Sequence, residues 1–220
     1  MWVLAVATWL VGPSAHADIE VWSPNEQATL SVFGSLLSRL EAWSWFEGGA
    51  DADNDGVDAF ETVRLGAKLQ HSRIRVLFEG QHTQFQNLPG DAAAPAPRGA
   101  LGTGATYFQH TGDRSATAFF IKHLYLDFKD LLVPWFGGVD LRLGRFAYLD
   151  GLEATTGEAK IDWLKRVRGS EKLLGPFGWS AFQRGFDGAQ VGLDQPRFNW
   201  TTMVSRPTQG GFEEKAGETI

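Results

Sequence analysis

The chain contains the stretch DADNDG, whose acidic spacing opens the calcium-binding loop of EF-hand proteins. Counted from Asp51, the residues Asp53 and Asp55 stand at positions 3 and 5, and Gly56 stands at position 6. Position 12 of such a loop carries a bidentate glutamate, but this chain has Thr62 there, and neither flank shows helical periodicity. The stretch is therefore interpreted as a turn rich in Asp, Asn and Gly. No metal is expected beyond a weak surface calcium site at Asp51, Asp53 and Asp55.

No other set of residues predicts an enzyme or a cofactor site. The chain has no cysteine, which excludes thiolate nucleophiles, thiolate metal ligands and disulfides. GTGAT at 102–106 lacks the third glycine of a dinucleotide loop, and no helix is expected after it. GWSAF at 178–182 lacks the closing glycine of a nucleophile elbow. We therefore expect no catalytic residues, no cofactor and no enzymatic activity.

The remaining candidates for chemistry are basic residues that fall on or beside the polar faces of predicted strands. They are Arg39, Arg64, Lys68, Arg75, Arg142, Arg145 and Arg184. A water-filled passage lined by guanidinium groups would lower the free energy of a passing anion. The alternative is that Glu41, Glu79, Asp127 and Asp140 pair with the arginines and brace the wall, and both interpretations can hold together.

The alternation assigns Arg145 and Arg184 to a strand face less firmly than it assigns the other basic residues. Gly144 is a candidate β-bulge, which would reset the alternation just before Arg145. Asp187 and Glu158 are candidate ion-pair partners for these two arginines.

Apolar and polar residues alternate with a period of two through most of the chain, the pattern of strands with one apolar face. Seven strands are predicted, at 29–47, 61–70, 73–81, 119–129, 139–146, 186–193 and 197–205. In the first of them, Leu36 and Leu40 fall on one face, and Arg39 and Glu41 fall on the other. A short helix within 158–175 is left open.

Long and short links alternate between the predicted strands, and this regularity suggests the fold. Outer-membrane barrels have short periplasmic turns and long extracellular loops. We expect an all-β, antiparallel up-and-down outer-membrane β-barrel whose apolar faces contact lipid. Such barrels have even strand counts of eight or more, and the final residues, GGFEEKAGETI, read as a loop. The segment 18–220 is therefore expected to hold only the N-terminal strands of a larger barrel, with the chain apparently truncated at its C-terminus.

The N-terminal residues predict export. WVLAVATWLV is an uninterrupted apolar run, too short to span a bilayer, and Ala15 and Ala17 fit an A-x-A cleavage site. Residues 1–17 are interpreted as a signal peptide and Asp18 as the mature N-terminus, with a buried strand as the alternative. The formal charge of −6 argues against a nucleic-acid binder that works by bulk charge.

Four stretches from residue 119 onward resemble the alginate export family of outer-membrane β-barrel proteins: LYLDFKD, VDLRLGRFAYLDG, KLLGPFGWSAFQRGFDGAQVGL and FNWTTMVSRP. That family carries a strand ending in Leu-Gly-Arg, then Leu-Leu-Gly, a tryptophan, an arginine, and Phe-Asp-Gly opening the next strand. The matching positions are Leu143, Gly144, Arg145, Leu173, Leu174, Gly175, Trp179, Arg184, Phe186, Asp187 and Gly188. The resemblance implies a monomeric barrel with a basic lumen that passes anionic polysaccharide, or a related porin. This chain is shorter than the family's barrel, and the resemblance does not imply alginate itself.

Two functions from different classes follow. The first is a channel or exporter in the outer membrane of a Gram-negative bacterium. It would contact lipid and pass an anionic small molecule or a polysaccharide such as alginate through an arginine-lined lumen. The alternative is a secreted, soluble β-sandwich that binds carbohydrate by stacking sugars on tryptophans such as Trp43, Trp45, Trp179 and Trp200.

Overall fold

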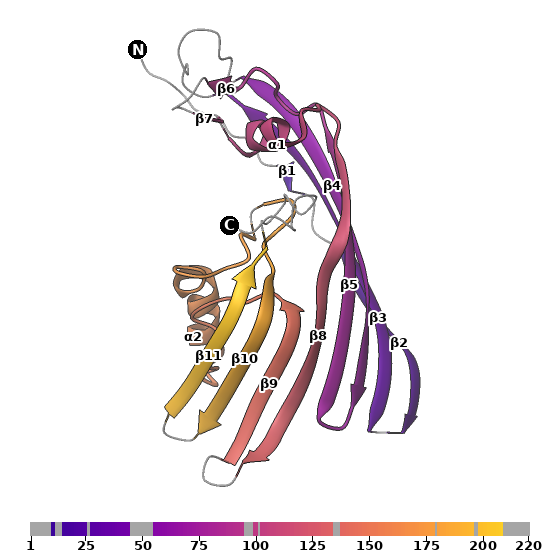
Figure 1. Ribbon diagram of the computed structural model, residues 1–220, viewed down its shortest axis with the longest axis vertical. Coiled ribbons are helices and arrows are strands. Elements are labelled where there is room, and N and C mark those ends of the chain that lie inside the picture. Colours follow the sequence, from indigo (N-terminus) through magenta and orange to yellow (C-terminus); the bar gives the residue numbers. More distant parts are fainter. Residues whose placement is uncertain are drawn as a thin grey trace. The chain divides into compact units, whose positions relative to one another are not determined.

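The computed structural model describes residues 10–11, 15–25, 27–44, 55–94, 99–100, 102–133, 137–178, 180–195 and 198–208. Its main feature is one nine-stranded β-sheet, drawn as arrows in Figure 1. The strands are β1 (Leu10–Val11), β2 (Ala15–Asn25), β3 (Ala28–Trp43), β4 (Gly56–His71), β5 (Ile74–Gln86), β8 (Thr117–Val133), β9 (Gly137–Phe146), β10 (Phe186–Gln195) and β11 (Phe198–Pro207).

The sheet has a simple antiparallel order. From β3 to β11, each of these strands pairs with the next one along the sheet, in the order β3-β4-β5-β8-β9-β10-β11. Both β1 and β2 pair with β3, so they lie at one end of the order and β11 lies at the other. Among the described strands the sheet is not closed.

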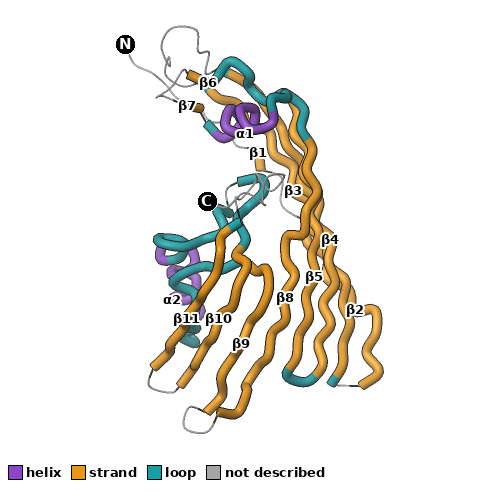
Figure 2. Tube along the Cα trace, viewed as in Figure 1, coloured by secondary structure: helices purple, strands orange, loops and turns teal. Residues whose placement is uncertain are grey.

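All seven predicted strands are present, and most extend beyond their predicted ends. The seven predicted strands leave out β1, which lies in the segment interpreted as a signal peptide, and β2, whose described side chains from Asp18 to Pro24 are all exposed. A strand at the end of the sheet order whose described side chains are all exposed shows little of the alternation on which the prediction rested. Figure 2 shows how strand dominates the fold.

Two helical segments and a small second sheet lie in the long links. The helix α2 (Ala159–Leu164), followed by a π-helical turn at Lys165–Gly169, falls within the segment left open as a short helix. The helix α1 (Thr103–Thr111) was not predicted, and it begins inside GTGAT, directly after β7 (Gly99–Ala100), which pairs with β6 (Ala93–Ala94). The expectation that no helix follows this glycine-rich stretch was therefore wrong. Among the described residues, no helix combines the length and apolar character needed to cross a membrane.

The chain divides into two compact units, each drawing on several strands. The first unit comprises Met1–Ala17, Gly34–Arg64 and Gln81–Phe120, and the second comprises Asp18–Phe33, Leu65–Gly80 and Ile121–Ile220. The strands β3, β4 and β5 contribute residues to both units, as does β8.

In each unit the strands bury polar side chains on one face and expose apolar side chains on the other. The buried polar residues of the strands include Arg39, Glu41, Asp58, Thr62, Gln81 and Thr83 in the first unit, and Glu79, Lys122 and Asp127 in the second. The exposed apolar residues include Leu36, Leu40 and Val63 in the first unit, and Leu65, Ile74, Phe78, Leu124, Leu126 and Leu143 in the second. The alternation predicted for these strands is confirmed, with Val76 and Leu141 only partly exposed.

Aromatic side chains hold α1 against the buried face of the first unit. The ring of Tyr107 in α1 lies 4.6 Å from that of Phe85, which in turn lies 5.9 Å from that of Phe60. Thr103 donates a hydrogen bond to the Glu41 carboxylate at 3.5 Å. The link between β5 and β8 therefore folds onto the same face that carries the buried polar residues.

Candidate functional site

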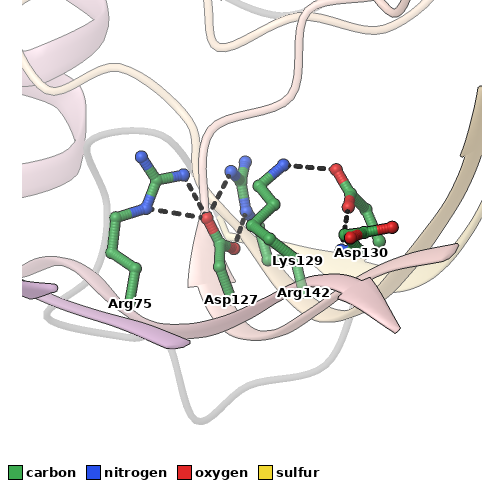
Figure 3. Close-up of polar contacts among 6 residues, drawn as sticks. Arg75, Asp127, Lys129, Asp130 and Arg142 are labelled. Atoms are coloured by element: carbon green, nitrogen blue, oxygen red, sulfur yellow. Dashed lines mark hydrogen bonds and ion pairs between the residues drawn. The ribbon is translucent and has the colours of Figure 1, made fainter. Parts of the chain in front are cut away.

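The most tightly connected polar group in the second unit is the Asp127 cluster, formed by Arg75, Asp127 and Arg142 (Figure 3). The Asp127 carboxylate is 1% exposed and lies between the two guanidinium groups. Arg142 donates from Nε to Oδ1 at 2.6 Å and from its terminal nitrogen to Oδ2 at 3.0 Å. Arg75 donates from Nε to Oδ2 at 2.9 Å, and its terminal nitrogen also contacts this oxygen. One carboxylate thus fixes two arginines that come from different strands.

Further ion pairs lie among the described residues of the second unit. They are Lys129 with Asp140 at 2.5 Å, Arg73 with Asp130 at 3.2 Å, Lys68 with Asp18 at 3.1 Å, and Arg145 with Asp187 at 2.6 Å. Glu79 and His123 form a side-chain hydrogen bond at 2.5 Å. The sequence identified most of these side chains as polar-face residues but did not pair His123 with Glu79. The signal was present, because both residues alternate with apolar neighbours in strands that are adjacent in the sheet.

The first unit holds the Arg39 cluster, which consists of Arg39, Glu41, Thr62, Arg64, Gln81 and Thr83. Arg39 pairs with Glu41 at 3.2 Å, and its guanidinium also lies over the Phe60 ring at 5.0 Å. Arg64 donates from Nε to the amide oxygen of Gln81 at 2.7 Å, and Gln81 donates to Thr83 at 2.9 Å. The guanidinium groups of Arg39 and Arg64 are therefore both held by hydrogen bonds to other side chains of the cluster.

A cavity of about 320 Å³ opens on the polar face in the second unit. Its lining comes from β8 to β11 and from the link after β9. The lining residues are Asp127, Lys129, Asp130, Gly138, Asp140, Leu141, Arg142, Glu153, Gln190, Gly192, Leu193, Asp194, Asn199 and Thr201. Acidic side chains outnumber basic ones in this lining, so the paired arginines do not make it a basic cavity.

Glu153 enters the cavity lining from outside the strands and is held by Tyr148. The Tyr148 hydroxyl donates to the Glu153 carboxylate at 2.6 Å. Desolvation alone would raise the pKa of Glu153, but this hydrogen bond, together with hydrogen bonds from the backbone amides of Glu153 and Gly151, lowers the pKa below its usual value. Desolvation and the same hydrogen bond raise the pKa of Tyr148. The hydrogen bond between Tyr148 and Glu153 therefore fixes the link after β9 beside the cavity, with Glu153 in its ionised form.

Arg145 has the register of the apolar face, contrary to the expectation that it lines the polar one. It stands opposite Leu124 in β8 and Asp187 in β10, and opposite residues share a face. The pairing with Asp187 that the sequence suggested is confirmed, at 2.6 Å. The expected bulge at Gly144 does not reset the alternation, because the register shift between β8 and β9 lies at Phe128 and Leu131 instead.

The glycines of the family-like motif permit close strand approach. Gly144 has φ of 124°, and a Cβ built there would lie 2.2 Å from the carbonyl oxygen of Leu124. Gly144 stands opposite Gly188, where a Cβ would lie 2.2 Å from the carbonyl oxygen of Val204. Leu143 lies in β9, Phe186 and Asp187 open β10, and Leu174 and Gly175 lie in the link between these strands. Trp179, the remaining motif position, lies outside the described residues.

Arg184 lies just before β10 and stacks on an aromatic ring. Its guanidinium carbon is 4.1 Å from the centroid of the Phe177 ring.

The weak calcium site considered from the sequence cannot be located, because Asp51 and Asp53 lie outside the described residues. No group of side chains suited to holding a metal ion occurs in the part of the chain that the structure describes.

No family model matches the chain, and no curated protein or solved structure matches it. The fold and the site define a class nonetheless. The chain is an all-β protein with one large antiparallel sheet, whose strands bury paired charges on one face and expose apolar side chains on the other.

Proposed function

We propose that this chain forms part of the wall of an outer-membrane β-barrel in a Gram-negative bacterium, and that the barrel passes anionic solutes through an arginine-lined lumen. The apolar face would contact lipid and the polar face would line the lumen. The resemblance of residues 119–207 to the alginate export family makes anionic polysaccharide a candidate solute.

The single observation that carries this proposal is the inverted burial of the strands. Asp127, Lys122 and Thr62 are at most 2% exposed, whereas Leu65 is 66% exposed and Phe119 is 73% exposed. A soluble sheet with one buried face packs apolar side chains inward and turns polar ones to water. Barrel strands in a membrane do the reverse, with apolar residues toward lipid and polar residues toward the interior.

The choice of an anionic solute rests on the arginines of the polar face. Carboxylates hold Arg39, Arg75 and Arg142 in place and offset much of their charge. Arg64 lies on the same polar face, and its Nε donates to the side-chain amide of Gln81. Replacing Arg64 therefore tests whether the positive charge of this face sets selectivity.

Arg64→Glu is expected to shift the selectivity of single channels in planar bilayers from anions toward cations. The shift should be larger at low salt than at high salt, because the reach of a charge shortens from about 30 Å at 0.01 M to about 3 Å at 1 M. Arg142→Glu should shift selectivity in the same direction but also weaken the fold, since it places a second carboxylate beside Asp127.

Arg73→Glu is the matched control, because Arg73 is 53% exposed at the turn between β4 and β5. Its effect on selectivity should be smaller than that of Arg64→Glu. Unchanged selectivity in Arg64→Glu, combined with lower thermal stability, would make the arginines structural braces and remove the support for anion transport.

The export step makes a separate prediction. Mass spectrometry of protein extracted from the outer membrane should show a mature chain that begins at Asp18, which pairs with Lys68. The backbone of β2 runs from Ala15 through this position, and most of residues 1–14 lie outside the described residues. Recovery of a membrane-embedded chain that retains residues 2–11 would contradict cleavage at this site.

A further inference from the structure

The segment that leads into β10 is a closed loop that starts at Pro176. The Arg184 amide donates to the Pro176 carbonyl oxygen at 2.5 Å, and the Ser180 amide donates to that of Phe177 at 2.8 Å. The Gln183 amide donates to the Ser180 hydroxyl at 2.9 Å. Phe177 and Gln183 have φ of 55° and 61°, a left-handed conformation that is strained when the residue is not glycine. Such a conformation persists only where its surroundings fix it, so Phe177 and Gln183 are held in defined positions.

The loop presents a guanidinium group that the carboxylates of the described residues leave available. The Arg184 group stacks on Phe177 at 4.1 Å, and its buried Nε atom has no hydrogen-bond partner. Within the described ranges, no carboxylate forms an ion pair with Arg184, in contrast to Arg75, Arg142 and Arg145. Stacking occupies a face of the guanidinium plane and leaves its N–H edges available to a ligand.

A second cation lies under the same loop. Lys122 is 2% exposed, and its ammonium donates to the carbonyl oxygens of Phe182 at 3.0 Å and of Gln183 at 2.5 Å. These two carbonyls hold the ammonium against the backbone of the loop. The Asp187 carboxylate, near the start of β10 just after the loop, pairs with Arg145. The loop therefore combines a fixed, stacked guanidinium with a buried ammonium beneath its backbone.

We propose that Arg184, stacked on Phe177, binds a bidentate oxyanion, either a carboxylate or a phosphate group of the solute. The inference rests on the proposed function in that it takes an anionic solute as the ligand. A planar guanidinium binds such groups through two parallel N–H···O bonds, whereas a lysine ammonium acts as a point charge. The residue type, the stacking and the free edge together fit this role.

Equilibrium binding to the full chain in detergent tests the site. Isothermal titration would use glucuronate, glucose 6-phosphate and uncharged glucose as probes. At least one of the two anions should bind more tightly than glucose, and the tighter one identifies the oxyanion. Arg184→Gln should weaken that binding about tenfold or more, as expected for loss of charge-assisted hydrogen bonds. Arg184→Lys should restore only part of it.

Two further variants distinguish binding at Arg184 from a nonspecific effect of losing a positive charge elsewhere on the protein. Phe177→Leu should weaken binding less than Arg184→Gln, because it removes the stacking partner and keeps the charge. Arg73→Gln, at an exposed ion pair, should bind as the wild type does. Thermal unfolding of each variant shows whether it is folded, and Arg184→Lys keeps the test open if Arg184→Gln is not.

The outcomes for the site and for transport are distinguishable. Equal binding of all three probes, or unchanged anion binding in folded Arg184→Gln, overturns the site even if bilayers show anion selectivity. Anion binding that depends on Arg184 supports the site even if bilayers show no anion selectivity, in which case only the transport proposal fails.

Discussion

Asp127→Ala is expected to lower the free energy of unfolding by about 3–5 kcal/mol, the largest effect of any single substitution considered for this chain. The carboxylate is 1% exposed and accepts hydrogen bonds from both Arg75 and Arg142. Its removal would leave two guanidinium groups close together with no carboxylate between them. Breaking a buried ion pair by removing one partner costs more than the pair contributes, because the remaining charge stays buried. Denaturant unfolding in lipid vesicles, followed by tryptophan fluorescence, measures the change.

Asp130→Ala is the matched control for this substitution. Asp130 also pairs with an arginine, but its side chain is 59% exposed and Arg73 is 53% exposed. Exposed ion pairs contribute about 0–1 kcal/mol. Asp130 has φ of 50°, which aspartate tolerates better than alanine, so the control should lose about 2 kcal/mol or less, clearly less than Asp127→Ala. Asp127→Asn should lower the free energy of unfolding by an amount between those of the two alanine variants, since asparagine keeps an acceptor oxygen and the shape but loses the charge. Equal stability of Asp127→Ala and Asp130→Ala would mean that the Asp127 cluster is open to water.

Leu65→Arg is expected to cost about 2–4 kcal/mol if Leu65 lies near the bilayer midplane. The Leu65 side chain is 66% exposed on the apolar face of β4. In a soluble protein an exposed leucine tolerates replacement, and surface substitutions usually change stability by less than about 0.5 kcal/mol. On a lipid-facing wall the same guanidinium would enter hydrocarbon. Reversible unfolding of the variant in vesicles gives the cost.

Gln70→Arg provides the control in the same strand. Gln70 is five positions from Leu65, so it alternates onto the opposite face, and an arginine there should be nearly neutral. A near-zero cost for Leu65→Arg, in a chain that stays soluble without detergent, would favour the secreted sandwich over the membrane wall. A cost for Leu65→Arg alone would support the assignment of the two faces.

The faces of the strands could be predicted from the sequence because alternation is a local property. Leu36 and Leu40 are separated from Arg39 and Glu41 by the pleat of one strand, and no other part of the chain is needed to assign them. The long seven-strand pattern was predictable for the same reason. By contrast, β2 and α1 have weak local signals. The described side chains of β2 are all exposed, and α1 starts in a glycine-rich stretch and is held by the contact of Tyr107 with Phe85.

What the sequence by itself determined is therefore the all-β class, the strand positions and the separation of apolar from basic side chains. Only the tertiary structure decided which charges meet. Asp127 lies 52 residues from Arg75 and 15 from Arg142, and strand register alone brings the three together. The strand register also places Arg145 on the apolar face beside Asp187, because the face of a side chain is set by the residues opposite it in the neighbouring strands. Arg184 stacks on Phe177 because an irregular loop with left-handed residues brings the two side chains together. Such a loop leaves no periodic pattern in the sequence.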